Sequence, residues 1–226
     1  LIAQVRQVER EAVLDSDFRL GVSHALVRHW HERYGYAGEA HVVVPCTLGR
    51  AHIKETGPPT ARQDALGFGQ EDIVLVYSGS SAGWQSFALL EAFLEQMMRE
   101  KAQVKALFLC RPDPQVDALV ARSSGRVLRT WVPAADVSDI LAGCDHGILL
   151  REDSLTNRVA SPTKFAEYLR AGLPVIVPEH LGDFTALVRR DHLGTVHAAG
   201  LSLPRLDRTS SAERRRLASY ALRNFV

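Results

Sequence analysis

The 226-residue sequence has few cysteines, little net charge and no long apolar run. Its apolar stretches are all shorter than the ~18 residues that a membrane-spanning helix needs, so we expect no such helix. The first residues, LIAQVRQVEREAV, predict an amphipathic helix and lack the apolar block of a signal peptide. The formal net charge of +1 gives no electrostatic reason to expect nucleic acid or a membrane as the partner of these residues.

Cysteine and histidine spacing argues against disulfide and metal sites. The three cysteines, Cys46, Cys110 and Cys144, are widely spaced, and we expect buried, reduced thiols at the last two, as in a cytoplasmic protein. The nine histidines show no zinc-type spacing, and His29 and His31 would face different sides of a helix. We therefore predict no metal site. The chain also does not begin with Met, which is consistent with a fragment of a longer protein.

The sequence does contain a regular alternation of apolar runs and amphipathic stretches. Apolar residues make up 46% of the chain and charged residues 23%, as in an ordinary soluble globular protein. Between the apolar runs lie stretches with helical periodicity, with Asp136 and Asp183 as N-caps and a capping box of Ser210 and Glu213 before the last helix. The apolar runs predict strands at 73–78, 104–110, 126–132, 146–150, 174–177 and 195–197. This alternation predicts an α/β fold with a doubly wound, Rossmann-like parallel sheet covered by helices on both faces.

The first 50 residues follow a different pattern. They predict a helix, a short strand, a second helix starting at Ser23 and a strand at HVVVP, which is too little to enclose a core. The polar, proline-containing segment KETGPPTARQ (54–63) is typical of a linker. We expect residues 1–50 to end one domain, 51–72 to form a linker, and 73–226 to form a complete domain whose last helix could pack back on the first part.

The first of two strand-to-helix junctions that suit a ligand is YSGSSAGWQ (77–85). Ligands of doubly wound sheets bind at the carboxyl ends of strands, beside helix N-termini. Small residues such as Gly79 and Ser80 allow tight turns and exposed backbone N–H groups, which suit a phosphate. The junction lacks the lysine of a Walker loop and is not a full GxGxxG motif, so an ordinary glycine-rich turn is the alternative interpretation.

The second junction, SPTKFAEYLRAGLPVIVP (161–178), predicts a short helix with defined ends. Ser161 is a favourable N-cap, and Pro162 fits the first helical position, where no backbone donor is lost. Gly172 stands where a left-handed C-cap is expected, and Pro174 prevents the helix from continuing. Because the helix follows the strand HGILL, its start falls at the edge of the sheet where ligands bind.

This helix start carries side chains with specific chemistry. The partial positive charge of a helix N-terminus, with donors from Ser161, Thr163 and Lys164, suits an anion. Glu167, one turn further on, could accept protons from two hydroxyl groups, as a carboxylate facing a ribose does in other nucleotide-binding folds. The alternative is an ordinary surface Lys–Glu pair at helical spacing, which contributes about a few tenths of a kcal/mol.

Taken together, these motifs resemble a known family. SPTKFAEYLRAGLPVIV, preceded by ILAGCDHGILL and YSGSSAGWQ, looks like the donor-binding, C-terminal half of a GT-B glycosyltransferase. Within that fold it is most similar to the group-1, or GT4-like, family. SDFRLGVSHALVRHWHERYGYAGEAHVVVPC resembles the segment that closes the N-terminal domain of these enzymes. The resemblance covers nearly the whole chain, and the pattern S-P-x-K-x-x-E-Y-x-x-x-G-x-P-V-I is fairly specific.

The resemblance implies transfer of a sugar from a nucleoside-diphosphate sugar to a glycan or glycolipid acceptor, in cytoplasmic polysaccharide biosynthesis. It implies that Glu167 holds the nucleotide ribose and that Gly79 and Ser80 lie beside the diphosphate or the sugar. Lys164 would lie near the phosphates, together with the backbone at the start of its helix.

The resemblance also implies where the other parts of the donor and the acceptor bind. The base would lie against backbone near Trp131 and Val132. Helix dipoles and cations, rather than a metal, would stabilise the leaving diphosphate, so we expect no cofactor. Acceptor contacts and any general base would come from the N-terminal domain, of which this chain holds only the end, so we assign no catalytic residue. That domain could also bring peripheral membrane association; no nucleic acid partner is expected.

The sequence departs from the family pattern at two places. Many members have a Glu-x7-Glu pair, whose first position is Val159 here. Members also often carry an Arg and a Lys after the first glycine loop, whereas this sequence has no basic residue between Gly79 and Arg99. Our hypothesis is that Lys164 supplies that charge. A GT-B-type sugar-nucleotide epimerase and a non-catalytic nucleotide-binding or scaffold domain are the alternatives.

Overall fold

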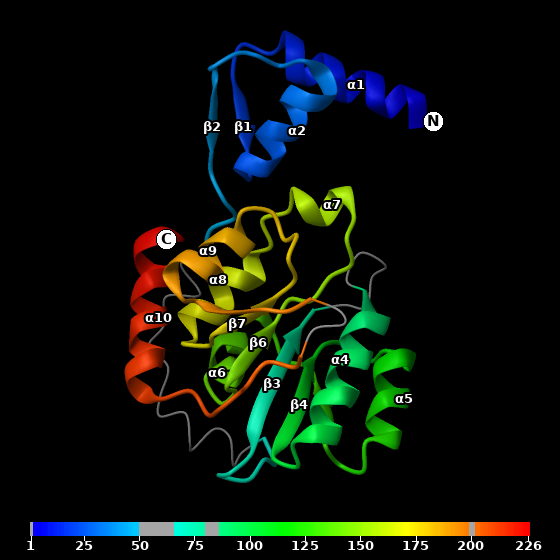
Figure 1. Cartoon of the computed structure of the whole chain (residues 1–226), viewed down its shortest axis with the longest axis vertical. Helices are drawn as coiled ribbons and strands as arrows, with labels where there is room; N and C mark the ends of the chain where they lie inside the picture. The colour runs from blue at the N-terminus through cyan, green and yellow to red at the C-terminus, as the bar shows by residue number, and fades with distance from the viewer. Residues whose placement is uncertain (1, 50–65, 80–85, 199–201) are drawn as a thin grey trace.

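The computed structural model describes most of the chain (Figure 1). The described residues are 2–49, 66–79, 86–198 and 202–226, with side chains described from residue 4 onward. The predicted linker segment 54–63 and Ser80 lie outside these ranges.

The larger part of the molecule is built on a six-stranded parallel sheet with the order β5-β4-β3-β6-β7-β8. Counted along the chain from β3, this is the 3-2-1-4-5-6 order of Rossmann folds, which reverses between β3 and β6. The strands are β3 (Ile73–Ser78), β4 (Val104–Leu109), β5 (Val127–Thr130), β6 (His146–Ile148), β7 (Val175–Val177) and β8 (Gly194–Val196). The predicted doubly wound parallel sheet is confirmed.

Helices cover both faces of this sheet, which explains why its strands are continuous apolar runs. In β3, Val74 and Val76 face one core cluster, while Leu75 and Tyr77 face the other. The first cluster is closed by α6 (Val137–Leu141), α8 (Thr163–Arg170), α9 (Phe184–Asp191) and α10 (Ser211–Asn224). The second is closed by α4 (Phe87–Glu100) and α5 (Pro114–Arg122).

Several predicted boundaries change in the structure. Strand β5 ends at Thr130, so Trp131 and Val132 lie in the loop that follows it, before a short 3-10 helix, η3 (Ala134–Asp136). Strand β6 ends at Ile148 and is followed by a one-turn helix that the sequence pattern did not predict, α7 (Leu155–Arg158). Both changes lengthen the loops at the carboxyl edge of the sheet.

The helix caps were predicted with mixed success. The Ser210 hydroxyl accepts a hydrogen bond from the backbone N–H of Glu213 at 3.2 Å, which confirms that N-cap. Asp136 and Asp183 stand at N-cap positions, but neither side chain bonds its own helix. The Glu213 carboxylate bonds Arg216 instead of reaching back to the start of α10.

The first part of the chain forms a small separate unit, seen at one end of the molecule in Figure 1. It comprises α1 (Ile2–Asp15), β1 (Arg19–Gly21), α2 (His24–Tyr34) and β2 (His41–Val43), and the two strands pair in parallel. The predicted elements are therefore confirmed. A small cluster of Val13, Val27, Trp30 and Tyr36 forms its core. The domain boundaries drawn from the sequence stay a prediction.

Asp183, at the start of α9, connects this unit to the larger part. Its carboxylate accepts hydrogen bonds from the backbone N–H groups of His24 and Ala25, at 2.6 and 3.1 Å, and lies 3.6 Å from the Arg28 guanidinium. The carboxylate thus satisfies the free donors at the N-terminus of α2, where a negative charge is stabilising. This explains why it does not cap its own helix.

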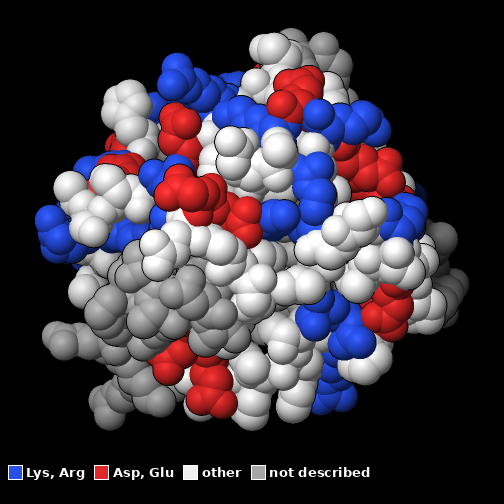
Figure 2. All heavy atoms as spheres, turned by 90° about the horizontal axis from the view of Figure 1, so that it is seen from below, with Lys and Arg blue, Asp and Glu red and all other residues white. Residues whose placement is uncertain are grey.

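Charged side chains of both signs lie side by side on the face seen in Figure 2, in keeping with the small net charge. Among the helices of the described residues, none combines the length and apolar character needed to cross a membrane.

Candidate functional site

The reversal of strand order between β3 and β6 places the candidate site. Doubly wound sheets bind ligands in the crevice outside the carboxyl ends of the two strands at such a switch point. Gly79 follows β3 directly, and Arg151 follows β6 after two buried leucines. Helix α8 starts in the same region, so the two junctions found in the sequence meet at one edge of the sheet.

The side chain of Lys164 lies directly against Gly79. A Cβ atom built on Gly79 would collide with Nζ and Cε of Lys164. Gly79 also has a φ of +141°, a conformation that side-chain-bearing residues rarely adopt. Two residues that the sequence singled out separately are therefore brought into contact, and the glycine is what leaves room for the ammonium.

The Lys164 side chain is half-buried, and its ammonium lies beside an aromatic ring. Its Nζ is 4.7 Å from the centroid of the Tyr77 ring, within the range of a cation–π contact. The pKa of Lys164 is lowered from 10.5 to about 8, first by burial and then by the charge of Arg151, while the charge of Glu167 opposes the shift. An anion bound here would relieve this destabilisation of the charged lysine.

Arg151 is a cation that the sequence analysis missed. It is only 6% exposed, and its Nη1 donates to the side-chain oxygen of Asn157 at 3.3 Å. Its position directly after the run HGILL could have revealed it, because the residues that follow a parallel strand lie at the ligand edge.

Glu167 and Tyr168 occupy the second turn of α8. Glu167 is half-buried and close enough to Lys164 to affect its pKa. Tyr168 is fully buried, and its hydroxyl accepts a hydrogen bond from the N–H of Ser78 at 2.8 Å, which fixes the end of β3 to α8. The absence of a side chain at Gly147 makes room for the Tyr168 ring.

A pocket of about 610 Å³ opens at the carboxyl ends of β3, β4 and β5. Its walls include Gly79, Trp131 and Val132, three of the residues predicted to bind the donor. The Trp131 side chain is 51% exposed, and the Arg111 guanidinium lies 5.6 Å from the centroid of its ring. The size falls within the roughly 300–1,000 Å³ of small-molecule sites. Through Gly79 the pocket borders on Lys164.

Ser161 and Thr163 differ in their placement. Thr163 is the first residue of α8, whereas the N-cap position belongs to Pro162, so the prediction of Ser161 as N-cap is wrong. The Ser161 hydroxyl instead accepts a hydrogen bond from the N–H of Cys46 at 2.9 Å, which draws it toward the chain leaving β2. The predicted end of the helix is confirmed, since Gly172 has a left-handed φ of +79°.

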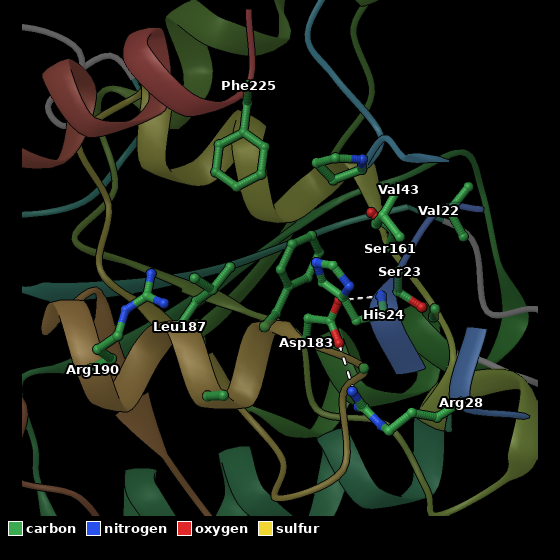
Figure 3. A pocket seen from close by; sticks show the side chains of 15 residues that line it. Val22, Ser23, His24, Arg28, Val43, Ser161, Asp183, Leu187, Arg190 and Phe225 are labelled. Carbon is green, nitrogen blue, oxygen red and sulfur yellow. Dashed lines mark hydrogen bonds and ion pairs between the residues drawn. The ribbon is translucent and has the colours of Figure 1, made fainter. Parts of the chain in front are cut away.

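Ser161 lines a different pocket, of about 560 Å³, between the first unit and α9 (Figure 3). Figure 3 shows Asp183 between His24 and Arg28, with Leu187 and Arg190 of α9 to one side. The structure therefore gathers Gly79, Lys164, Trp131 and Val132 around one region and places Ser161 at the boundary between the two parts.

Metal and thiol chemistry find little support in the described part of the chain. There, no group of three or more His, Cys, Asp or Glu side chains could hold a metal ion. Cys110 and Cys144 are buried and free, as predicted, and burial raises the pKa of Cys110 to about 11. A thiol with so high a pKa is a poor nucleophile at neutral pH.

Comparison with solved structures shows which fold this is. HepE from Anabaena, in complex with UDP-glucose, has a TM-score of 0.75 and 16% identity over 99% of this chain and 64% of its own. WaaG, a glycosyltransferase involved in lipopolysaccharide biosynthesis, has a TM-score of 0.62 and 17% identity over 89% of this chain and 56% of its own. A glycosyltransferase from Rickettsia africae has a TM-score of 0.65 and 11% identity over 98% of this chain and 62% of its own.

The described chain therefore has the fold expected of the C-terminal half of a GT-B glycosyltransferase, joined to a short preceding unit. It spans between 56% and 64% of the length of the three structures named. No protein-family model matches the sequence, and no curated protein sequence matches it significantly.

Proposed function

We propose that this chain binds a nucleoside-diphosphate sugar at the switch point and forms the donor-binding half of a glycosyltransferase that acts on a glycan or glycolipid acceptor. The observation that carries the proposal is the Lys164 ammonium held against Gly79 at the carboxyl edge of β3. A diphosphate binds well at a helix N-terminus that has a cation nearby and a glycine that leaves space for the phosphate oxygens. The similar solved structures that hold UDP-glucose, or UDP and glucose, support this choice of ligand.

In the proposed complex each part of the donor has its own residues. The diphosphate contacts Gly79, the start of α8 at Thr163, and the Lys164 ammonium. Glu167 accepts hydrogen bonds from the ribose hydroxyls. The base enters the pocket lined by Trp131 and Val132. Ser80 and Ser161 remain candidate donor contacts from the sequence alone.

The proposed reaction needs stabilisation of negative charge on the leaving group. The bond between the anomeric carbon and the diphosphate oxygen breaks, and both electrons of that bond remain on the diphosphate. The acceptor hydroxyl oxygen forms the new bond, and its proton passes to a base outside this half of the enzyme. Lys164 and the α8 dipole stabilise the departing diphosphate, and no metal cofactor is part of the proposal.

For the whole protein we propose membership of the GT4-like group, on the pattern SPTKFAEYLRAGLPVIV. We also propose that it acts in cytoplasmic polysaccharide biosynthesis, as the resemblance implies. Acceptor contacts and any peripheral membrane association come from a more complete N-terminal domain. The non-catalytic alternative is favoured by Val159, which stands where many family members have a carboxylate.

Thermal stability with nucleotide sugars tests the proposal. One of the UDP, GDP or ADP sugars is expected to stabilise the chain, by about 2.7 kcal/mol at a concentration of 100 times Kd. Glu167→Ala should abolish that stabilisation because the ribose contact is lost. Glu95→Ala, which removes an exposed glutamate on α4, is the matched control and should bind like the wild type.

Product assays, together with the thermal measurements, separate the alternatives. Release of the nucleoside diphosphate in the presence of an acceptor, with the longer protein, favours the transferase. Conversion of the sugar nucleotide to an epimer favours the epimerase. No stabilisation by any of the nucleotide sugars would contradict the proposal and favour the scaffold domain.

A further inference from the structure

Arg151 is a buried cation whose charge acts on the Lys164 ammonium. Arg151 is 6% exposed, and its charge is one of the causes that depress the pKa of Lys164. The two residues come from different elements, the loop after β6 and the first turn of α8. Both elements lie at the switch point, where Gly79 and Lys164 are in contact and Arg151 is shielded from most water.

The Arg151 guanidinium is held in position but not neutralised. Within the described residues its hydrogen-bond partner is the neutral side-chain oxygen of Asn157, at 3.3 Å. Its Nε is buried and has no hydrogen-bond partner there. A buried donor without a partner is costly, so an acceptor that a ligand brought to this N–H group would be stabilising.

The loop around Arg151 is rigidly built. Asn157 is fully buried, and its Nδ2 donates to the backbone carbonyl of Glu152 at 3.0 Å. The Ser154 hydroxyl caps α7 by accepting from the N–H of Asn157 at 3.3 Å. On the other side, an imidazole nitrogen of His180 lies 3.0 Å from the Arg151 carbonyl oxygen. These contacts fix the Arg151 backbone and the Asn157 side chain that accepts from its guanidinium.

Two neighbouring cations at a low-dielectric site destabilise each other unless an anion lies between them. Glu167 offsets part of this repulsion, as its effect on the pKa of Lys164 shows. A singly charged group would leave much of the repulsion in place. The arrangement is best matched by a ligand with more than one negative charge and several acceptor oxygens, such as a diphosphate.

We infer that Arg151 is the second cation that contacts the donor diphosphate, acting with Lys164 in place of the basic residues absent between Gly79 and Arg99. This inference rests on the proposed function and adds a residue to it. Arg151 donates to one phosphate oxygen and Lys164 to another, so the charge released when the glycosidic bond breaks is shared by both.

Nucleotide affinity measured by calorimetry tests the inference. The ligands are UDP and UMP, with GDP and ADP and their monophosphates as further probes. For Arg151→Gln we expect UDP affinity to fall roughly 10- to 100-fold, because a charge-assisted hydrogen bond is lost, and UMP affinity to fall by a much smaller factor. The matched control is Arg214→Gln, which removes a largely buried guanidinium paired with Asp145 before β6, at the other edge of the sheet. It should lower the melting temperature and leave both affinities unchanged.

The outcomes distinguish the inference from the proposed function. If the wild type binds UDP and Arg151→Gln binds it within twofold of the wild type, the inference is wrong and the proposed function stands. Equal losses for UDP and UMP also contradict it. If the wild type binds none of the diphosphates, both fail. Should Arg151→Gln not fold, the NMR resonance of the Arg151 Nε–Hε group in the wild type decides. A shift on adding UDP supports the inference, and an unchanged resonance at saturation refutes it.

Discussion

Single residues determine how the switch point could hold an anion. Lys164 lies against Gly79 and over the Tyr77 ring, and the charge of the buried Arg151 acts on it. None of these residue types binds an anion strongly on an exposed surface. Here their low exposure favours anion binding, since burial strengthens electrostatic interactions and makes an unneutralised charge costly.

Replacing Lys164 should remove the main electrostatic contact with a diphosphate. For Lys164→Met we expect UDP affinity to fall roughly tenfold or more, measured by calorimetry, because the charge-assisted hydrogen bond is lost. The control is Lys105→Met on β4, whose ammonium lies 3.9 Å from Asp72. If Lys164→Met and Lys105→Met bind UDP with equal affinity, the proposed role of Lys164 is wrong.

The depressed pKa of Lys164 predicts a pH dependence of binding. Since that pKa is about 8 in the free chain, the ammonium loses its proton as the pH rises through 8, and UDP affinity should decline between pH 7 and pH 9.5. The loss should be absent in Lys164→Met. Calorimetric titrations of both proteins across this range provide the measurement, and a wild-type affinity that does not change with pH would contradict the prediction.

The same pKa shift predicts the stability of the ligand-free chain. Because the unfolded lysine has its ordinary pKa of 10.5, the unfolded state binds more protons than the folded state between pH 8 and 10.5. The contribution of Lys164 to the free energy of unfolding therefore rises with pH across this window. Denaturant titrations of the wild type and Lys164→Met should show this difference, and parallel curves would contradict it.

At the scale of elements, local patterns predicted most helices and strands but not the contacts between them. The left-handed Gly172 and the apolar strands follow from short-range rules, and both are confirmed. Ser161 was misjudged because its hydroxyl is used by Cys46, 115 residues away in the sequence. The position of Arg151 after a predicted strand was a local signal for the ligand edge, but that β6 lies beside β3, at the same switch point as Gly79, is something no local pattern reveals.

Gly79 leaves the space in which Lys164, from α8, lies against the end of β3. Gly79→Ala should lower UDP affinity, because the new methyl group would displace the Lys164 ammonium. Its positive φ should also cost stability, about 1–3 kcal/mol. Gly125→Ala is the matched control, since Gly125 has a φ of +78° and open space around its Cβ position. It should lose stability in thermal melts and keep its UDP affinity; equal UDP affinities of the two variants would contradict the prediction.

At the scale of the whole molecule, two parts of unequal size are joined through the start of α2. The Ser23 hydroxyl donates to the Val159 carbonyl at 2.8 Å, close to the Asp183 contacts with His24 and Ala25. These bonds hold the first unit against the edge of the larger part. They also keep the segment between Val159 and α8 in place, next to the candidate site.

Removing the Asp183 carboxylate should loosen this connection. For Asp183→Ala we expect the amides of α2 to exchange faster with solvent, with an opening free energy lower by about 1 kcal/mol, because the helix loses a capping carboxylate. Asp136→Ala is the control, since Asp136 also stands at an N-cap without bonding its helix. Hydrogen exchange followed by mass spectrometry provides the measurement, and equal protection of α2 in both variants would contradict the prediction.

At this scale the central claim is that a diphosphate binds where β3, β6 and α8 meet. The most direct measurement is a crystal structure of this chain with UDP. We expect a phosphate oxygen within hydrogen-bond distance of Lys164 Nζ and the base in the pocket of Trp131. UDP bound elsewhere, for example in the pocket of Figure 3, with Lys164 making no contact to it, would contradict the claim.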